Sequence, residues 1–185
     1  MIDLKTLPKA ELHLHIEGTF EPELIFAMAE RNGIDPGYPC VQTLRAAYAF
    51  TDLQSFLDVY YAGMRVLRTE RDYYELTHAY LERAFGQGVR HAEIFFDPQA
   101  HTARGVAFGT VIEGLSRALD EARARLGITS HLILCFLRDQ PVASAMETLE
   151  AALPYRSRIV AVGLDSAEAG NPPSKFVTVF DRARA

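Results

Sequence analysis

The run Ala10–Ile16 (AELHLHI) is the first regular element of the sequence, and Glu17-Gly18-Thr19 ends it. Side chains at i and i+2 of a β-strand project from the same face of the sheet. This spacing predicts one face with Glu11, His13 and His15 and an opposite face with Leu12, Leu14 and Ile16. We therefore expect a strand with an ionisable face and an apolar face, followed at once by polar residues.

Three further short apolar runs follow, and longer helical patterns separate them. The remaining strands are expected at 89–96, 131–137 and 158–164. Helices are expected at 22–31, 53–67, 70–85, 108–126 and 142–153, and another begins near Ser174. Apolar strands that alternate with helices predict a parallel sheet covered on both faces.

Two architectures satisfy this alternation, an open doubly wound sheet and a (β/α) barrel. No Gly-x-Gly-x-x-Gly or phosphate-binding loop follows any strand, which weighs against a nucleotide-binding open sheet. Ionisable and polar residues instead follow the strands: His13, His15 and Glu17, then Asp97, then Arg138 and Asp139, then Asp165, Ser166 and Glu168. Because a (β/α) barrel carries its chemistry at the carboxyl ends of its strands, we expect an α/β fold with about the first four β/α units of a (β/α)8 TIM barrel.

The composition is that of an ordinary globular protein. Of 185 residues, 49% are hydrophobic and 23% charged, and the net charge of −5 comes without a basic stripe. We expect no nucleic-acid partner and no membrane span. Cys40 and Cys135 form no sequence motif for a metal or a disulfide, and Met1–Lys5 lacks the features of a signal peptide, so a cytoplasmic location is expected.

The His13-x-His15 pair predicts a metal site. The two side chains leave the strand about 7 Å apart on one face, and imidazole nitrogens bind zinc at about 2.0–2.1 Å. The alternative is a pair of polar histidines bonded to the backbone, but the position just before Glu17, at the rim of a barrel, favours the metal. His101 is the only other histidine expected at that rim, as a loop residue in contact with substrate or solvent. No strand end offers a clear third ligand or a clear general base.

Several blocks of the sequence carry a resemblance to a known family. They are Leu7–Thr19, Leu53–Leu57, Phe96–Thr102, Val162–Glu168 and Asn171–Phe176. Together they resemble the adenosine/adenine deaminase family, which are metal-dependent hydrolases on a (β/α)8 barrel. Glu17 stands where adenosine deaminases carry Asp, and the sequence looks most like the bacterial and fungal adenine deaminase branch.

The resemblance implies roles for individual residues. His13 and His15 would be two ligands of one Zn²⁺, and Phe56 and Leu57 would form a hydrophobic lid over a purine. Glu17 takes the position that meets the ribose in adenosine deaminases, where a longer acid suits a free base better.

Two other positions remain open between a binding role and a local one. Asp97 would either line the pocket or cap the turn at Pro98. Asp165 and Ser166 would contact the purine, or Asp165 would form an Asx-turn. Tyr60-Tyr61 and Tyr73-Tyr74 are interpreted as packing residues.

The same resemblance points to missing parts. The family's third zinc histidine and its proton-shuttling glutamate belong to a His-Ala-Gly-Glu block, and a later histidine and an Asp-Asp pair complete the site. None of these occurs in the sequence. We therefore expect residues 1–185 to be the amino-terminal portion of a single deaminase barrel domain, with the general acid/base beyond Ala185. Such an open half-barrel is expected to be inactive alone and to self-associate.

The predicted activity is zinc-dependent hydrolysis of adenine to hypoxanthine and ammonia, a purine-salvage reaction. Three alternatives stay open: a deaminase of adenosine or another 6-aminopurine, a phosphoesterase of the polymerase-and-histidinol-phosphatase type, and a non-catalytic fragment. The phosphoesterase also opens with His-x-His on a barrel strand, but it needs further histidines and acids at the next strand ends.

Overall fold

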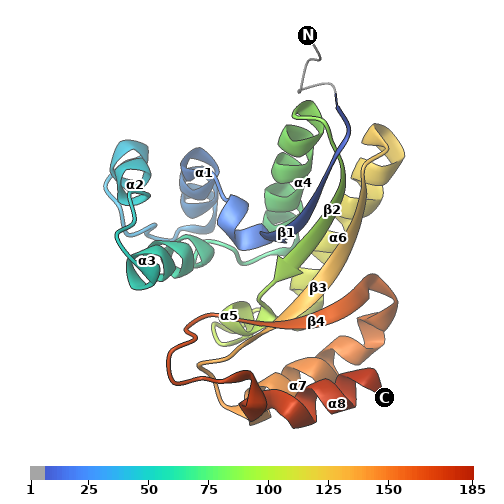
Figure 1. The fold of residues 1–185 in the computed structure, drawn as a ribbon. Helices are drawn as coiled ribbons and strands as arrows, with labels where there is room; N and C mark the ends of the chain where they lie inside the picture. Colours follow the sequence, from blue (N-terminus) through green and yellow to red (C-terminus); the bar gives the residue numbers. More distant parts are fainter. Residues whose placement is uncertain (1–6) are drawn as a thin grey trace.

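Four parallel strands form one sheet in the computed structural model, which describes residues 7–185 (Figure 1). In space the strands lie in chain order, β1 (Lys9–His15), β2 (Val89–Phe96), β3 (Thr129–Leu137) and β4 (Ile159–Asp165). A doubly wound sheet reverses its direction of winding, whereas a barrel adds every new strand on the same side. The predicted α/β fold with the first four units of a (β/α) barrel is confirmed. Met1–Lys5, where no signal peptide is expected, lies outside the described residues.

The helices agree with the sequence patterns except for two short ones. They are α1 (Pro22–Asn32), α2 (Val41–Ala47), α3 (Leu53–Met64), α4 (Glu70–Gly86), α5 (Pro98–Thr102), α6 (Phe108–Leu126), α7 (Val142–Ala152) and α8 (Val177–Arg184). Three short 3-10 turns, η1 (Ile16–Thr19), η2 (Leu153–Arg158) and η3 (Pro173–Phe176), join them. The sequence did not predict α2 and α5, because helices this short show no readable apolar periodicity. Within residues 7–185, no helix is long and apolar enough to cross a membrane.

The core lies between the sheet and the helices α4 and α6, which pack side by side behind it (Figure 1). On β2 the side chains of Ala92, Ile94 and Phe96 are fully buried, whereas Phe95 between them is only half-buried. Residues of alternate parity on a strand face opposite sides of the sheet. The helix side of β2 is therefore the packed core, and Phe95 faces the side that becomes the interior of a barrel.

A cluster around the Asp72 carboxylate fixes the start of α4 and its contact with α1. Its Oδ2 accepts hydrogen bonds from the backbone N–H groups of Arg68 and Thr69, at 2.9 and 2.8 Å. Arg31 and Asn32, at the end of α1, also bind Asp72. These bonds satisfy donors that a helix start leaves free and attach α1 to α4.

The predicted alternation along β1 is wrong at its centre. Glu11 pairs with Ala92 and Leu14 with Ile94, so three residues of β1 span two residues of β2. Because Ala92 and Ile94 share a face, this bulge places Glu11 on the helix side, where its Oε2 accepts a 2.8 Å hydrogen bond from Tyr80. Leu12, expected on the apolar face, is 58% exposed.

The contact between α4 and α6 predicts a large penalty for one added methyl group. A Cβ at Gly114 would lie 2.5 Å from the Glu70 carbonyl oxygen and 2.7 Å from the Tyr73 Cβ. We expect Gly114→Ala to lower the free energy of unfolding by about 1–3 kcal/mol, because the helices must separate. Gly86→Ala is the matched control, since a Cβ there meets nothing within 4 Å and alanine favours the helix. Urea unfolding measures both, and equal stabilities of the two variants would contradict the packing.

Candidate metal and substrate site

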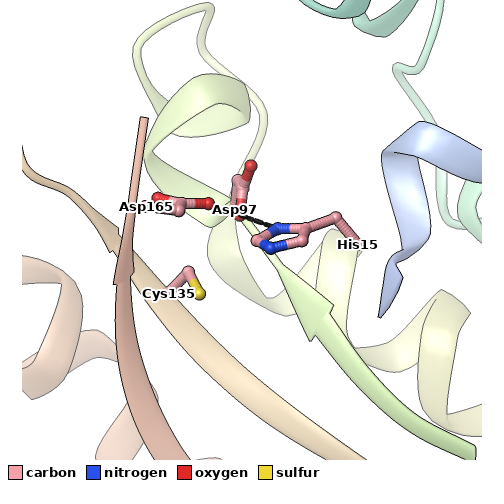
Figure 2. A group of neighbouring side chains, drawn as sticks. All are labelled: His15, Asp97, Cys135 and Asp165. Atoms are coloured by element: carbon pink, nitrogen blue, oxygen red, sulfur yellow. Dashed lines mark ion pairs between the residues drawn. The ribbon is translucent and has the colours of Figure 1, made fainter. Parts of the chain in front are cut away.

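The carboxyl ends of all four strands bring a titratable cluster together (Figure 2). His15 is the last residue of β1, Asp97 follows β2, Cys135 lies on β3, and Asp165 is the last residue of β4. Ligand atoms of these four side chains all lie within 4.8 Å of one another. Such a set of nitrogen, oxygen and sulfur donors is suited to hold a metal ion.

The imidazole of His15 faces both carboxylates. Its Nδ1 is 3.4 Å from Asp165 Oδ2 and 3.6 Å from Asp97 Oδ1. Burial alone lowers the pKa of His15, but the interactions with Asp165 and Asp97 outweigh it and raise that pKa to about 10. Burial and the neighbouring Asp97 charge raise the pKa of Asp165 to about 9. Burial also disfavours the charged form of Asp97, but His15 overcomes this and lowers the pKa of Asp97.

Two oxygens in the cluster lack hydrogen-bond donors. Oδ1 of Asp97 and Oδ1 of Asp165 are buried, and neither has a partner among the described residues. An unpaired buried polar atom costs free energy that a cation beside it would recover. The site therefore fits a metal ion by its own chemistry.

The predicted ligands His13 and His15 both lie on the inner face of the sheet. Their rings stack on Phe95 with centroid distances of 4.5 and 5.1 Å, and the two imidazole centroids are 5.7 Å apart. Two imidazoles that share one zinc ion hold their centroids roughly 5 Å apart, so a small ring movement suffices. With both carboxylates at Nδ1 of His15, Nε2 is the nitrogen left for a metal, the arrangement in which a carboxylate orients a ligating histidine. His13 is outside the group of four, so the metal role of the pair stays a prediction.

Cys135 belongs to the cluster although its sequence context gave no sign of it. It is 1% exposed and faces the same interior as Phe95, with Gly163 of β4 opposite. Burial raises the pKa of the Cys135 thiol, and the nearby carboxylates raise it further. The sequence argument against a metal role for this residue rested on the absence of neighbouring ligands along the chain, whereas its neighbours come from other strands.

Two tyrosines of α3 reach the same cluster. Tyr60 donates a 2.7 Å hydrogen bond to Asp97 Oδ2, and Tyr61 donates one of 3.0 Å to Ser166 Oγ. Their interpretation as packing residues is incomplete, because each ring also carries a hydroxyl to a site residue. Asp97 occupies the N-cap position before Pro98, as one alternative expected, but its side chain makes no capping bond and lies in the cluster instead. The sequence carried one sign of these contacts, because both tyrosines lie on the predicted helix that also carries Phe56 and Leu57.

The strand ends and α3 enclose a cavity of about 420 Å³, within the range of small-molecule sites. All the predicted substrate residues except Glu17 line it, namely Phe56, Leu57, Asp97, Asp165 and Ser166. Glu17 lines an adjoining cavity of about 330 Å³, and Phe56 and Tyr60 are shared by both. The predicted positions therefore gather in one region, although their roles remain predictions.

Ser166 begins the loop after β4 with a positive φ of 69°, a backbone conformation that costs free energy for any residue except glycine. The bond from Tyr61 holds this residue in place. The alternative of an Asx-turn is wrong, because within residues 7–185 no backbone N–H donates to the Asp165 side chain.

Glu17 and His101 form a second, fully enclosed contact beside the cavity. Oε1 of Glu17 accepts hydrogen bonds from the Asp97 backbone N–H at 3.0 Å and from His101 Nε2 at 3.1 Å. His101 was expected in a loop, in contact with substrate or solvent, but it lies in α5 and is completely buried.

Comparison with known proteins gives a consistent result. The sequence model of the adenosine deaminase family matches residues 8–185. The chain is 64% identical over 181 residues to the adenine deaminase of Cupriavidus pinatubonensis, covering 98% of this chain and 52% of that protein. It is also 64% identical to the adenine deaminase of Streptomyces coelicolor, covering 98% of this chain and 54% of that protein. The chain thus spans about half the length of the curated relatives it matches.

Solved structures show the same fold. The adenine deaminase of Arthrobacter aurescens superposes with a TM-score of 0.93 at 57% identity, covering 96% of this chain and 54% of that one. An amidohydrolase of Burkholderia ambifaria with bound zinc superposes with a TM-score of 0.87 at 26% identity, covering 98% of this chain and half of that one.

The bond between Tyr60 and Asp97 gives a stability prediction. We expect Tyr60→Phe to lower the free energy of unfolding by about 1–3 kcal/mol, because a buried carboxylate oxygen loses its donor. Tyr155→Phe is the control, since it removes a 3.2 Å bond to Glu113 near the surface, where the change stays within about 0.5 kcal/mol. Chemical denaturation compares the two, and a Tyr60→Phe protein as stable as the control would refute the role given to this bond.

Proposed function

The chain belongs to the adenosine deaminase family, and we propose that it takes part in the hydrolytic deamination of adenine to hypoxanthine and ammonia. The observation that carries the proposal is the identity of 61–64% with eight adenine deaminases over nearly the whole chain. Because the chain covers only about half of each relative, the proposed activity is that of a protein of their full length. The match to this family argues against the phosphoesterase alternative.

In this proposal the metal is Zn²⁺, and His13 and His15 hold it. A zinc ion in such a site supplies a water molecule acidic enough to act as a nucleophile near neutral pH. The residues of the chain orient these ligands. The stack of both imidazoles on Phe95 fixes their planes, and Asp97 and Asp165 direct Nδ1 of His15 toward the protein.

The proposed substrate residues form two groups, one apolar and one polar. Phe56 and Leu57 would cover the purine ring and exclude water, while Glu17, Asp165 and Ser166 would meet its polar edge. Asp165 would present its carboxyl group to the polar edge of the ring from the wall of the cavity. Adenosine or another 6-aminopurine is the second candidate substrate, and it would have to fit a sugar or substituent beside Glu17.

We propose that residues 1–185 supply the amino-terminal four β/α units of one deaminase barrel domain. The proton-shuttling glutamate of the family has no equivalent in the predicted site, so the chain alone would be inactive. The absence of nucleic-acid and membrane partners and the cytoplasmic location stay predictions from composition.

A fusion protein tests the activity. We expect the chain joined to the carboxyl-terminal segment of the Cupriavidus pinatubonensis adenine deaminase to convert adenine to hypoxanthine, followed by purine absorbance, while the chain alone does not. His13→Gln and His15→Gln should each lower the rate at least about 100-fold and reduce bound zinc, measured by elemental analysis. His131→Gln, at the opposite end of β3, is the control and should keep both. An active isolated chain, or a fusion that prefers adenosine, would overturn the proposal.

The open sheet predicts self-association of the isolated chain. β1 and β4 are the two unpaired edges, and Leu12 on one and Val160 on the other are 58% and 57% exposed. Light scattering should show dimers or larger species, because such edges pair with other chains. Val160→Lys should shift the distribution toward monomer, with Ala143→Lys, at an exposed position of α7, as a control with the same change of charge. A stable monomer of the unsubstituted chain would count against the prediction.

A further inference from the structure

His101 links Glu17 to the half-buried Arg104 in a chain of hydrogen bonds. Arg104 Nη2 lies 2.7 Å from His101 Nδ1, and His101 Nε2 lies 3.1 Å from Glu17 Oε1. His101 is fully buried and Glu17 is 4% exposed. Tyr73 packs edge-on against the imidazole, with ring centroids 4.9 Å apart.

The order of donors along this chain follows from the chemistry of arginine. A guanidinium donates hydrogen bonds and accepts none, so Nδ1 of His101 must be the acceptor. The ring proton therefore lies on Nε2, which donates it to Glu17. Arg104 thus fixes both the tautomer of His101 and the direction in which it binds the carboxylate.

Arg104 is itself held by the segment that follows α3, the helix that carries Phe56 and Leu57. Its Nη1 donates to the carbonyl oxygens of Arg65 and Leu67 at 3.1 and 3.4 Å, and its Nε donates to Ala100 at 2.9 Å. The guanidinium is therefore anchored at both ends. Because the guanidinium is fixed in this way, it also fixes the orientation of the His101 ring.

Only one oxygen of Glu17 is satisfied by this arrangement. Oε1 takes both strong bonds, from His101 and from the Asp97 backbone. Oε2 lies 3.5 Å from the Tyr60 hydroxyl, but the single proton of that hydroxyl is donated to Asp97 at 2.7 Å. A buried carboxylate oxygen beside a cavity is left without a donor, and a bound molecule that brings an N–H group would satisfy it.

We propose that His101 and Arg104 are positioning residues that hold Glu17 so that Oε2 accepts a hydrogen bond from the ring N–H of a free purine base. This inference rests on the proposed function. It adds the reason why the protein would prefer a free purine base to a nucleoside. A nucleoside carries its sugar on that ring nitrogen, so it has no proton to donate there. His101 is buried, and Arg104, which is half-buried, binds the ring nitrogen of His101 that faces away from Glu17, so both act through Glu17.

The kinetic test uses the fusion protein with adenine as substrate and 9-methyladenine, which lacks the N–H, as inhibitor. His101→Asn should raise the KM for adenine about tenfold, because Oε2 loses its fixed direction, while kcat changes less than about threefold. The inhibition constant of 9-methyladenine should change less than about twofold. His101→Gln, whose amide can donate where Nε2 does, should restore the KM to within about threefold.

Gln99→Leu is the matched control on the same helix. Gln99 is as buried as Glu17, but its bonds go to Ser144 and to the Leu137 backbone, away from the pocket. This variant should have a lower free energy of unfolding. The ratio of the KM for adenine to the inhibition constant of 9-methyladenine should stay unchanged. Equal weakening of adenine and 9-methyladenine by His101→Asn would show a merely structural role and overturn the proposal.

A nitrogen-15 NMR spectrum of the histidines in the 185-residue chain tests the positioning separately. His101 should show the tautomer with its proton on Nε2, and Arg104→Lys should disturb the His101 signals. A proton on Nδ1 would refute the arrangement whatever the activity. If the spectrum agrees but the fusion does not deaminate adenine, the proposed function and the substrate part of this inference both fail, while the positioning of Glu17 stands.

Discussion

The buried carboxylate of Asp97 is the group on which the candidate site depends. A buried charge is tolerated only where hydrogen bonds and opposite charges replace the lost hydration. Asp97 receives a hydroxyl from Tyr60 of α3 and lies beside His15 of β1, and its backbone N–H is bound by Glu17 of η1. This one residue thus brings three segments that are far apart in the sequence, around positions 15–17, 60 and 97, together at one end of the sheet.

The same constraint explains the electrostatics of the cluster. Burial and the charge of Asp97 raise the pKa of Asp165, and His15 beside them lowers the pKa of Asp97. The two carboxylates occupy one nitrogen of His15 and leave the other for a ligand. The groups that form the candidate cation site therefore also shift the pKa values of one another.

The sequence predicted the strands and their polar ends well, because both follow from short-range patterns. Apolar runs such as Val89–Phe96 are visible as letters, and parallel strands must bring their carboxyl ends to one edge. The contacts of Tyr60 and His101 were not predictable in this way. A helical pattern shows which face of α3 is apolar but not what the tip of a tyrosine touches. The position of Glu11 depended on a bulge, which no alternation of residue types reveals.

Arg104 connects two parts of the candidate site, the end of α3 and the pair of His101 and Glu17. It binds the carbonyls that follow α3, the helix that carries Phe56, Leu57 and Tyr60, and it also fixes His101 and so Glu17. A movement of α3 away from the sheet would therefore disturb the bond from Tyr60 to Asp97 and the orientation of Glu17 together. The placement of α3 and the orientation of Glu17 are coupled through a single guanidinium, because no other described residue binds both His101 and the end of α3. In the proposed function, the helix that covers the substrate would thus also fix the residue that accepts its hydrogen bond.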